Sequence, residues 1–189
     1  DHDALTGDPL HVAGAGRWVE EGALNVLRLS REALTVRSVV EAIATIRPDI
    51  IFANSLFSRL TQRVVWARWR GQIRASPLVI APEGELVAGA LAIKPWRKRI
   101  WLDLARRTRL VDGVRWKAAN QMEANAISMA LSGAKTVILP HLPTQTPVPG
   151  RHDPKVAGKL RLLFLSRISP MKNLGFLLKL LQGMSARID

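Results

Sequence analysis

The residues best suited to chemistry lie in one short stretch near the end of the chain. In LRLLFLSRISPMKNLGFLLKLL (160–181), an apolar run ends at Ser166 and Arg167, a loop carries Lys172, and an apolar pattern with helical spacing follows. Ligands of open α/β sheets bind where strands end, and the free N–H groups of a helix start attract anions. Arg167 could hold a phosphate with two hydrogen bonds, and Lys172 could add a compact charge. We therefore predict a diphosphate site, the alternative being that both side chains are only solvated.

The overall composition indicates a folded protein with an anionic partner. The chain has 189 residues, of which 48% are hydrophobic and 23% charged, enough for one core or for one domain and part of another. Its 28 Lys and Arg against 15 Asp and Glu give a net charge of +13, which suggests nucleic acid, acidic lipid headgroups or a phosphorylated ligand.

The composition also limits the kinds of site that the chain can hold. The absence of cysteine excludes disulfides and Cys-ligated metal sites, and the four histidines fall in predicted loops at spacings that match no metal site. We therefore expect no metal and no cofactor. No uncharged apolar stretch is long enough for a membrane-spanning helix.

Hydrophobic periodicity predicts strands that alternate with helices, which is typical of a parallel sheet flanked by helices. The predicted strands are 24–29, 49–54, 77–81, 113–118 and 135–140. The predicted helices are 35–47, 56–72, one or two within 86–110, and 120–131. Pro95 can occupy the first turn of a helix, and Asn120 with Glu123 three residues later has the spacing of a capping box.

The predicted domain organisation is one α/β domain followed by the start of another. Residues 1–142 form the first domain, and 143–158 read as a linker because the surrounding stretch 141–158 carries four prolines. Residues 159–189 supply only one strand and one helix, so we expect a two-domain protein whose sequence is cut at both ends.

The 160–181 stretch closely resembles the start of the C-terminal domain in family 4 glycosyltransferases, which have the GT-B fold of two Rossmann-like domains. That family has a strand, then Gly-Arg-x-x-x-x-Lys-Gly/Asn, then a helix, and its Arg and Lys bind the diphosphate of the nucleotide-sugar donor. The resemblance places Arg167 and Lys172 in these roles, as catalytic and diphosphate-binding residues. Ser166 stands where glycine is usual, and Asn173 fits the pattern.

The resemblance extends upstream and covers most of the chain, from about residue 24 onward. RPDIIFANSLFS (47–58), PLVIAPEGELVAGALAIKPWRKRIWLDLARR (77–107) and VDGVRWKAANQMEANAI (111–127) are similar to family stretches in the same order. By this resemblance the acceptor side of the cleft would be lined by Asn54, Ser55, Glu83, Gly84 and Glu85. Glu83 departs from the family, which usually has Arg or His there, so it would contact sugar hydroxyls, or it is a solvated turn residue.

The resemblance implies transfer of a sugar from a nucleotide-sugar donor to an acceptor hydroxyl, with retention of configuration and without a metal. The acceptor would be a glycan or a lipid-linked molecule of cell-envelope synthesis, and the enzyme would be cytoplasmic or peripheral on the inner membrane face. The family's Glu-x7-Glu motif does not occur in the chain, which ends before it should arrive. We therefore expect these 189 residues to be inactive alone.

Two basic stretches rich in tryptophan support a further hypothesis. KPWRKRIWLDLARRTR (94–109) and WARWRGQIR (66–74) have the composition of helices that lie on anionic lipid. The alternative is an ordinary amphipathic helix with its Trp residues, Ile100 and Leu102 packed inward. Nucleic acid is not expected as a partner, because the chain shows no aromatic RNA platform, helix-turn-helix or zinc module.

Two other functions stay open from the sequence. The first is a non-enzymatic basic α/β module that binds an anionic membrane or nucleic acid. The second is a relative of the same fold that acts as a nucleotide-sugar epimerase or a phosphorylase, since one fold hosts many activities.

Overall fold

The computed structural model describes residues 16–73, 76–141, 162–166, 168 and 172–185. The chain divides into two compact units, Asp1–Pro140 and His141–Asp189, and each is described by itself.

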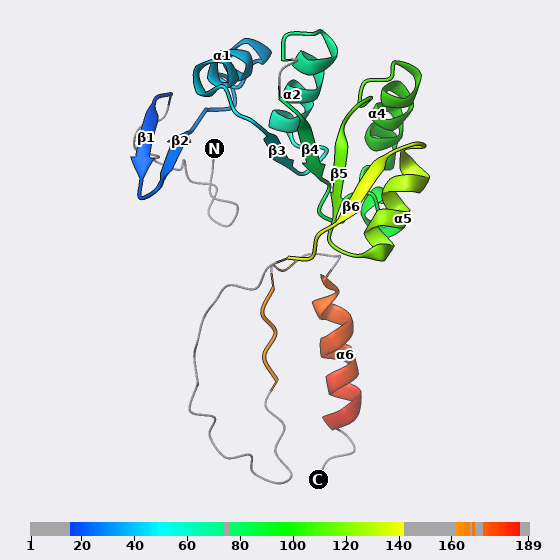
Figure 1. The fold of residues 1–189 in the computed structure, drawn as a ribbon. Coiled ribbons are helices and arrows are strands. Elements are labelled where there is room, and N and C mark those ends of the chain that lie inside the picture. Colours follow the sequence, from blue (N-terminus) through cyan, green and yellow to red (C-terminus); the bar gives the residue numbers. More distant parts are fainter. Residues whose placement is uncertain (1–15, 74–75, 142–161, 167, 169–171, 186–189) are drawn as a thin grey trace. The chain divides into compact units, whose positions relative to one another are not determined.

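The first unit is built on a parallel sheet of four strands (Figure 1). In spatial order the strands are β3 (Ile51–Asn54), β4 (Leu78–Ala81), β5 (Arg115–Ala118) and β6 (Lys135–Ile138). The helices of this unit are α1 (Val36–Ile46), α2 (Arg59–Trp69), the short α3 (Ala88–Leu91), α4 (Pro95–Arg107) and α5 (Gln121–Ala130). Helices α2, α4 and α5 lie in the crossovers between successive parallel strands, so the predicted α/β fold with a helix-flanked parallel sheet is confirmed.

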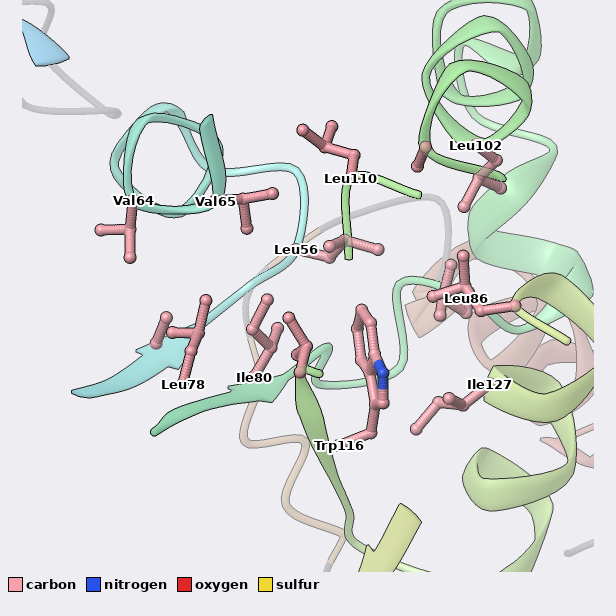
Figure 2. Packing of buried hydrophobic residues seen from close by; sticks show 14 of the residues in the cluster. Leu56, Val64, Val65, Leu78, Ile80, Leu86, Leu102, Leu110, Trp116 and Ile127 are labelled. Atoms are coloured by element: carbon pink, nitrogen blue, oxygen red, sulfur yellow. The ribbon is translucent and has the colours of Figure 1, made fainter. Parts of the chain in front are cut away.

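The core lies on one face of this sheet. The register places Ala53, Ile80 and Trp116 next to one another on three adjacent strands, and Trp116 is only 2% exposed. Figure 2 shows the indole of Trp116 between Ile80 and Ile127, which comes from α5. Helices α1, α2 and α4 add apolar side chains to the same cluster. Successive side chains of a strand point to opposite faces of the sheet, so every second side chain of these strands faces the same core.

The opposite face of the sheet is more open. Phe52 lies next to the core residue Ala53 on β3, and Val137 lies on β6; both are exposed. Lys117 lies on β5 between Trp116 and Ala118, so it points away from the core face. Lys117 lies near the carboxyl end of this strand.

The N-terminal part of the unit differs from the sequence prediction. The strand predicted at 24–29 exists as β2 (Leu24–Leu27), but it pairs antiparallel with β1 (Trp18–Glu21) in a separate hairpin. No strand was predicted at residues 18–21. Gly22 opens the two-residue turn with a φ of 62°, which suits a type II′ hairpin. The prediction that this strand joins the parallel sheet is therefore wrong, because a short apolar run does not specify its pairing partner.

The helix starts follow the local signals in the sequence. Asn120 Oδ1 accepts from the N–H of Glu123 at 2.9 Å, which confirms Asn120 as the N-cap of α5. Pro95 is the first residue of α4, as predicted. At α1, Thr35 and Ser38 form a reciprocal capping box that the sequence analysis did not predict.

The second unit contains one described helix, α6 (Leu174–Ser185), as predicted. The apolar run that ends at Ser166 was expected to form a strand. That prediction is wrong for its described residues 162–165, which have no regular structure, and Leu163 and Leu165 are exposed. A strand forms by pairing its backbone with a neighbour, and the described part of this unit holds no other strand. The predicted linker 143–158 lies outside the described residues. Within the described part of the chain, no helix combines the length and apolarity needed to cross a bilayer.

We predict that Trp116→Ala lowers the free energy of unfolding by about 3–5 kcal/mol, because it removes a large side chain from the shared core. The measurement is urea unfolding of the chain. Trp96→Ala is the matched control: that side chain is exposed, so its loss should change stability by no more than about 0.5 kcal/mol. Equal effects of the two substitutions would contradict the assignment of Trp116 to the core.

Candidate functional site

The candidate site lies where the parallel strands end. Because β3, β4 and β5 run in the same direction, the loops that follow them meet at one edge of the sheet, where α/β proteins bind ligands. Three glutamates in or next to these loops join them to one another. They are Glu83, Glu85 and Glu123.

The loop after β4 is a tight turn with left-handed backbone. The N–H of Glu85 donates to the carbonyl of Pro82 at 3.1 Å, and φ is 53° at Glu83 and 79° at Gly84. Two successive positive φ angles are those of a type I′ turn. Glycine adopts this conformation readily, whereas a glutamate in it is strained by about 1 kcal/mol. Contacts to the rest of the protein must therefore hold Glu83 in place.

One such contact is an ion pair with Lys117 on β5. The Nζ of Lys117 lies 3.2 Å from Oε1 of Glu83, and the lysine side chain is only 10% exposed against 35% for the glutamate. A buried ammonium is costly without an opposite charge, so the pair anchors the turn to the neighbouring strand. Sequence reasoning missed Lys117, although a lysine inside a compact strand was the available signal.

The second contact comes from Glu123 in the first turn of α5. Its carboxylate is buried, with the residue 5% exposed, and it accepts from the N–H of Gly84 at 2.6 Å and from the N–H of Ala119 at 2.7 Å. The predicted capping box is therefore wrong: the carboxylate reaches Ala119, one residue before Asn120, and the turn after β4. A carboxylate is also favoured beside the positive end of a helix. Glu123 thus links two loops to one helix.

The third link joins the ends of β3 and β4. The hydroxyl of Ser55 donates to Oε1 of Glu85 at 2.6 Å, and the N–H of Phe57 donates to Oε2 at 3.1 Å. Ser55 has a φ of 67°, and its own N–H donates to the carbonyl of Ala81 at 2.8 Å. The loop after β3 is therefore held against the turn after β4 by both backbone and side-chain bonds.

Most of the predicted acceptor-side residues come together here. Ser55 contacts Glu85, while Glu83 and Gly84 form the turn beside it. Asn54 is the last residue of β3 and is exposed. Glu85 uses both carboxylate oxygens to hold backbone and hydroxyl groups, so it positions the loops, whereas Glu83 is the exposed carboxylate of the turn.

The charges of this edge favour some ligands over others. Glu83, Glu85 and Glu123 place three carboxylates at this edge of a protein that is strongly basic overall, and Lys117 pairs with Glu83. Such an edge suits hydroxyl donors, which can give hydrogen bonds to a carboxylate, and disfavours phosphate.

The predicted diphosphate residues belong to the second unit. Ser166 and Lys172 are exposed, whereas Arg167 lies outside the described residues. Asn173 directly precedes α6 with a φ of 48°, and its carbonyl accepts from the N–H of Phe176 at 3.1 Å. The structure thus places Lys172 and Asn173 immediately before a helix start, the position that the sequence analysis expected.

Comparison with known proteins does not assign the chain to a family. No protein-family model matches the chain, and neither a curated protein nor a solved structure matches it significantly. Among the residues that the structure describes, no three His, Cys, Asp or Glu side chains are grouped so that they could hold a metal ion. The chain is an α/β protein with a Rossmann-like parallel sheet.

We predict that Glu123→Gln lowers the free energy of unfolding by about 1–3 kcal/mol. The amide nitrogen of the glutamine would face one of the two backbone N–H groups that the carboxylate binds, and two donors cannot form a hydrogen bond with each other. Hydrogen exchange of the Gly84 and Ala119 amides should accelerate more than that of the core strands. Glu41→Gln is the control: Glu41 makes an exposed ion pair with Arg37 within α1, and such pairs contribute little. If both substitutions have the same effect, Glu123 does not hold the two loops.

Proposed function

We propose that the protein is a glycosyltransferase with two Rossmann-like domains, of which this chain supplies the acceptor side and the start of the donor side. The observation that carries the proposal is the turn 82–85, held at the carboxyl edge of a parallel sheet. This turn lies in the stretch whose sequence resembles the acceptor side of family 4 glycosyltransferases. The reaction would move a sugar from a nucleotide-sugar to an acceptor hydroxyl with retention.

Opposite charges on the two sides support this division of roles. The edge of the first unit presents the Glu83 carboxylate, which can accept hydrogen bonds from acceptor hydroxyls. Arg167 and Lys172 would hold the donor diphosphate. During transfer the oxygen of the acceptor hydroxyl bonds to the anomeric carbon, and the bond from that carbon to the diphosphate breaks. The hydroxyl proton passes to the departing diphosphate oxygen. The diphosphate leaves with the electron pair, so cations beside it stabilise the transition state more than the ground state.

The partners follow from the same proposal. They are a nucleotide-sugar and a glycan or lipid-linked acceptor, with no nucleic acid. A lipid-linked acceptor of cell-envelope synthesis would place the enzyme in the cytoplasm at the inner membrane face. The alternative function is a non-enzymatic basic module, which the net charge of +13 favours. The two candidate functions predict different effects of UDP or GDP on the stability of the protein. Stabilisation of the protein by either nucleotide supports the transferase.

We predict that Arg167→Ala in the complete gene product lowers kcat for sugar transfer by about 100-fold or more, because it removes a cation from the departing diphosphate. The measurement is turnover of a panel of nucleotide-sugars. Lys179→Ala, which removes an exposed cation of α6, is the control and should leave kcat within about twofold. Unchanged turnover in Arg167→Ala would show that the diphosphate assignment is wrong.

We further predict that Glu83→Gln raises the KM for the acceptor by about tenfold and leaves the KM for the donor unchanged, since a hydrogen bond to a charged group is replaced by a neutral one. Glu41→Gln again provides a matched control, because Glu41 lies on α1. A rise in the donor KM alone would place Glu83 on the donor side and reject the acceptor role.

A further inference from the structure

Helix α4 carries apolar side chains on two opposite sides. Leu102 and Ala105 are buried in the core. Trp96, Ile100 and Leu104 are 61%, 60% and 44% exposed. These three residues are spaced four apart, so they form one stripe along the helix surface. We call this stripe and the exposed cations beside it the α4 outer face.

The exposure of this stripe distinguishes between the two interpretations of residues 94–109, which are a helix that lies on anionic lipid and an ordinary amphipathic helix. An ordinary amphipathic helix would turn its Trp residues and Ile100 inward together with Leu102. Leu102 does point inward, and Trp101 is half-buried with its ring 5.7 Å from that of Phe57 in an edge-on arrangement. Trp96 and Ile100 point outward, so the prediction of inward packing is wrong for them. Contiguous exposed apolar side chains on one helix commonly mark an interaction surface.

Cations border this stripe. The guanidinium of Arg97 lies over the ring of Trp96, 5.1 Å from its centroid. The other exposed cations of the α4 outer face are Lys94, Arg99 and Arg107. Asp103, the acidic residue of α4, forms an ion pair with Arg106. The α4 outer face therefore combines an apolar centre with a positive border.

The three residues of the stripe line one side of a groove. The groove has a volume of about 570 Å³, and its lining also includes Phe57, Arg59 and Trp101. The backbone of Phe57 donates to Glu85, which positions the loops of the site. The groove and the carboxyl edge of the sheet thus share a residue.

We propose that the α4 outer face docks on a membrane rich in anionic lipid, with the apolar stripe in the interface and the cations among the headgroups. The 13 residues of α4 extend about 20 Å, which suits a helix that lies along a surface. Nucleic acid would match the cations but would leave the three apolar side chains without an apolar partner. Docking does not require the proposed sugar transfer, although it would bring the site toward a lipid-linked acceptor.

The test is flotation of the complete gene product with vesicles of phosphatidylcholine, with and without phosphatidylglycerol. The wild type should bind vesicles that contain phosphatidylglycerol. The triple variant Trp96→Ser, Ile100→Ser, Leu104→Ser should reduce the partition coefficient about tenfold or more. Met122→Ser, Met129→Ser is the matched control, because these α5 side chains are also exposed, and its binding should be unchanged.

A second pair of measurements tests the two components of the face. Arg97→Gln, Arg107→Gln should weaken binding about tenfold at low salt and by less at high salt, as expected for contacts to headgroups. Brominated lipid should quench tryptophan fluorescence in the wild type and quench it less in Trp96→Phe.

Three outcomes would overturn the proposal. They are equal binding of the wild type and the triple variant, equal binding to neutral and anionic vesicles, and binding to duplex DNA without any binding to vesicles. The last outcome would favour a nucleic-acid module. Unfolding midpoints show whether each variant is folded. Flotation needs no nucleotide-sugar. A wild type that turns over no nucleotide-sugar would therefore reject the proposed transfer reaction without affecting docking.

Discussion

The geometry of the candidate site depends on one buried carboxylate. Glu123 accepts hydrogen bonds from Gly84 and Ala119, so a single side chain fixes the turn after β4, the loop after β5 and the start of α5. These are charge-assisted bonds to a buried carboxylate, and such bonds are stronger than those at the surface. The ion pair of Lys117 with Glu83 holds the same turn from the other side. These contacts offset the strain of about 1 kcal/mol that a glutamate has in a left-handed conformation.

Charge is distributed unevenly over this basic protein. The carboxyl edge of the sheet has an excess of carboxylates, whereas the α4 outer face carries the exposed cations of that helix. The two regions therefore favour different partners: hydroxyl groups at the edge and anionic headgroups at the face. Phe57 connects them, since its backbone contacts Glu85 and its ring packs against Trp101. In the proposed function, this uneven charge would separate acceptor recognition from membrane docking.

The sequence predicted what depends on local pattern and missed what depends on distant contacts. The apolar period identified the parallel strands and the helices between them, and the cap at Asn120 could be seen in the sequence. The role of Glu123 could not be predicted, because its partner Gly84 lies 39 residues away. The same holds for Lys117 and Glu83, which are 34 residues apart. The hairpin of β1 and β2 was missed although its signal is local, because the two-residue turn that Gly22 opens was not recognised.

The left-handed turn also restricts how this protein can change. At Gly84 a Cβ would meet no other atom, so the positive φ alone, and not lack of space, selects glycine there. At Glu83 the same backbone favours Gly, Asn and Asp and resists β-branched or bulky residues. A combinatorial library at this turn would therefore sample few viable side chains at position 83. New ligand preferences would have to arise from exposed neighbours such as Asn54, which sits on ordinary strand backbone.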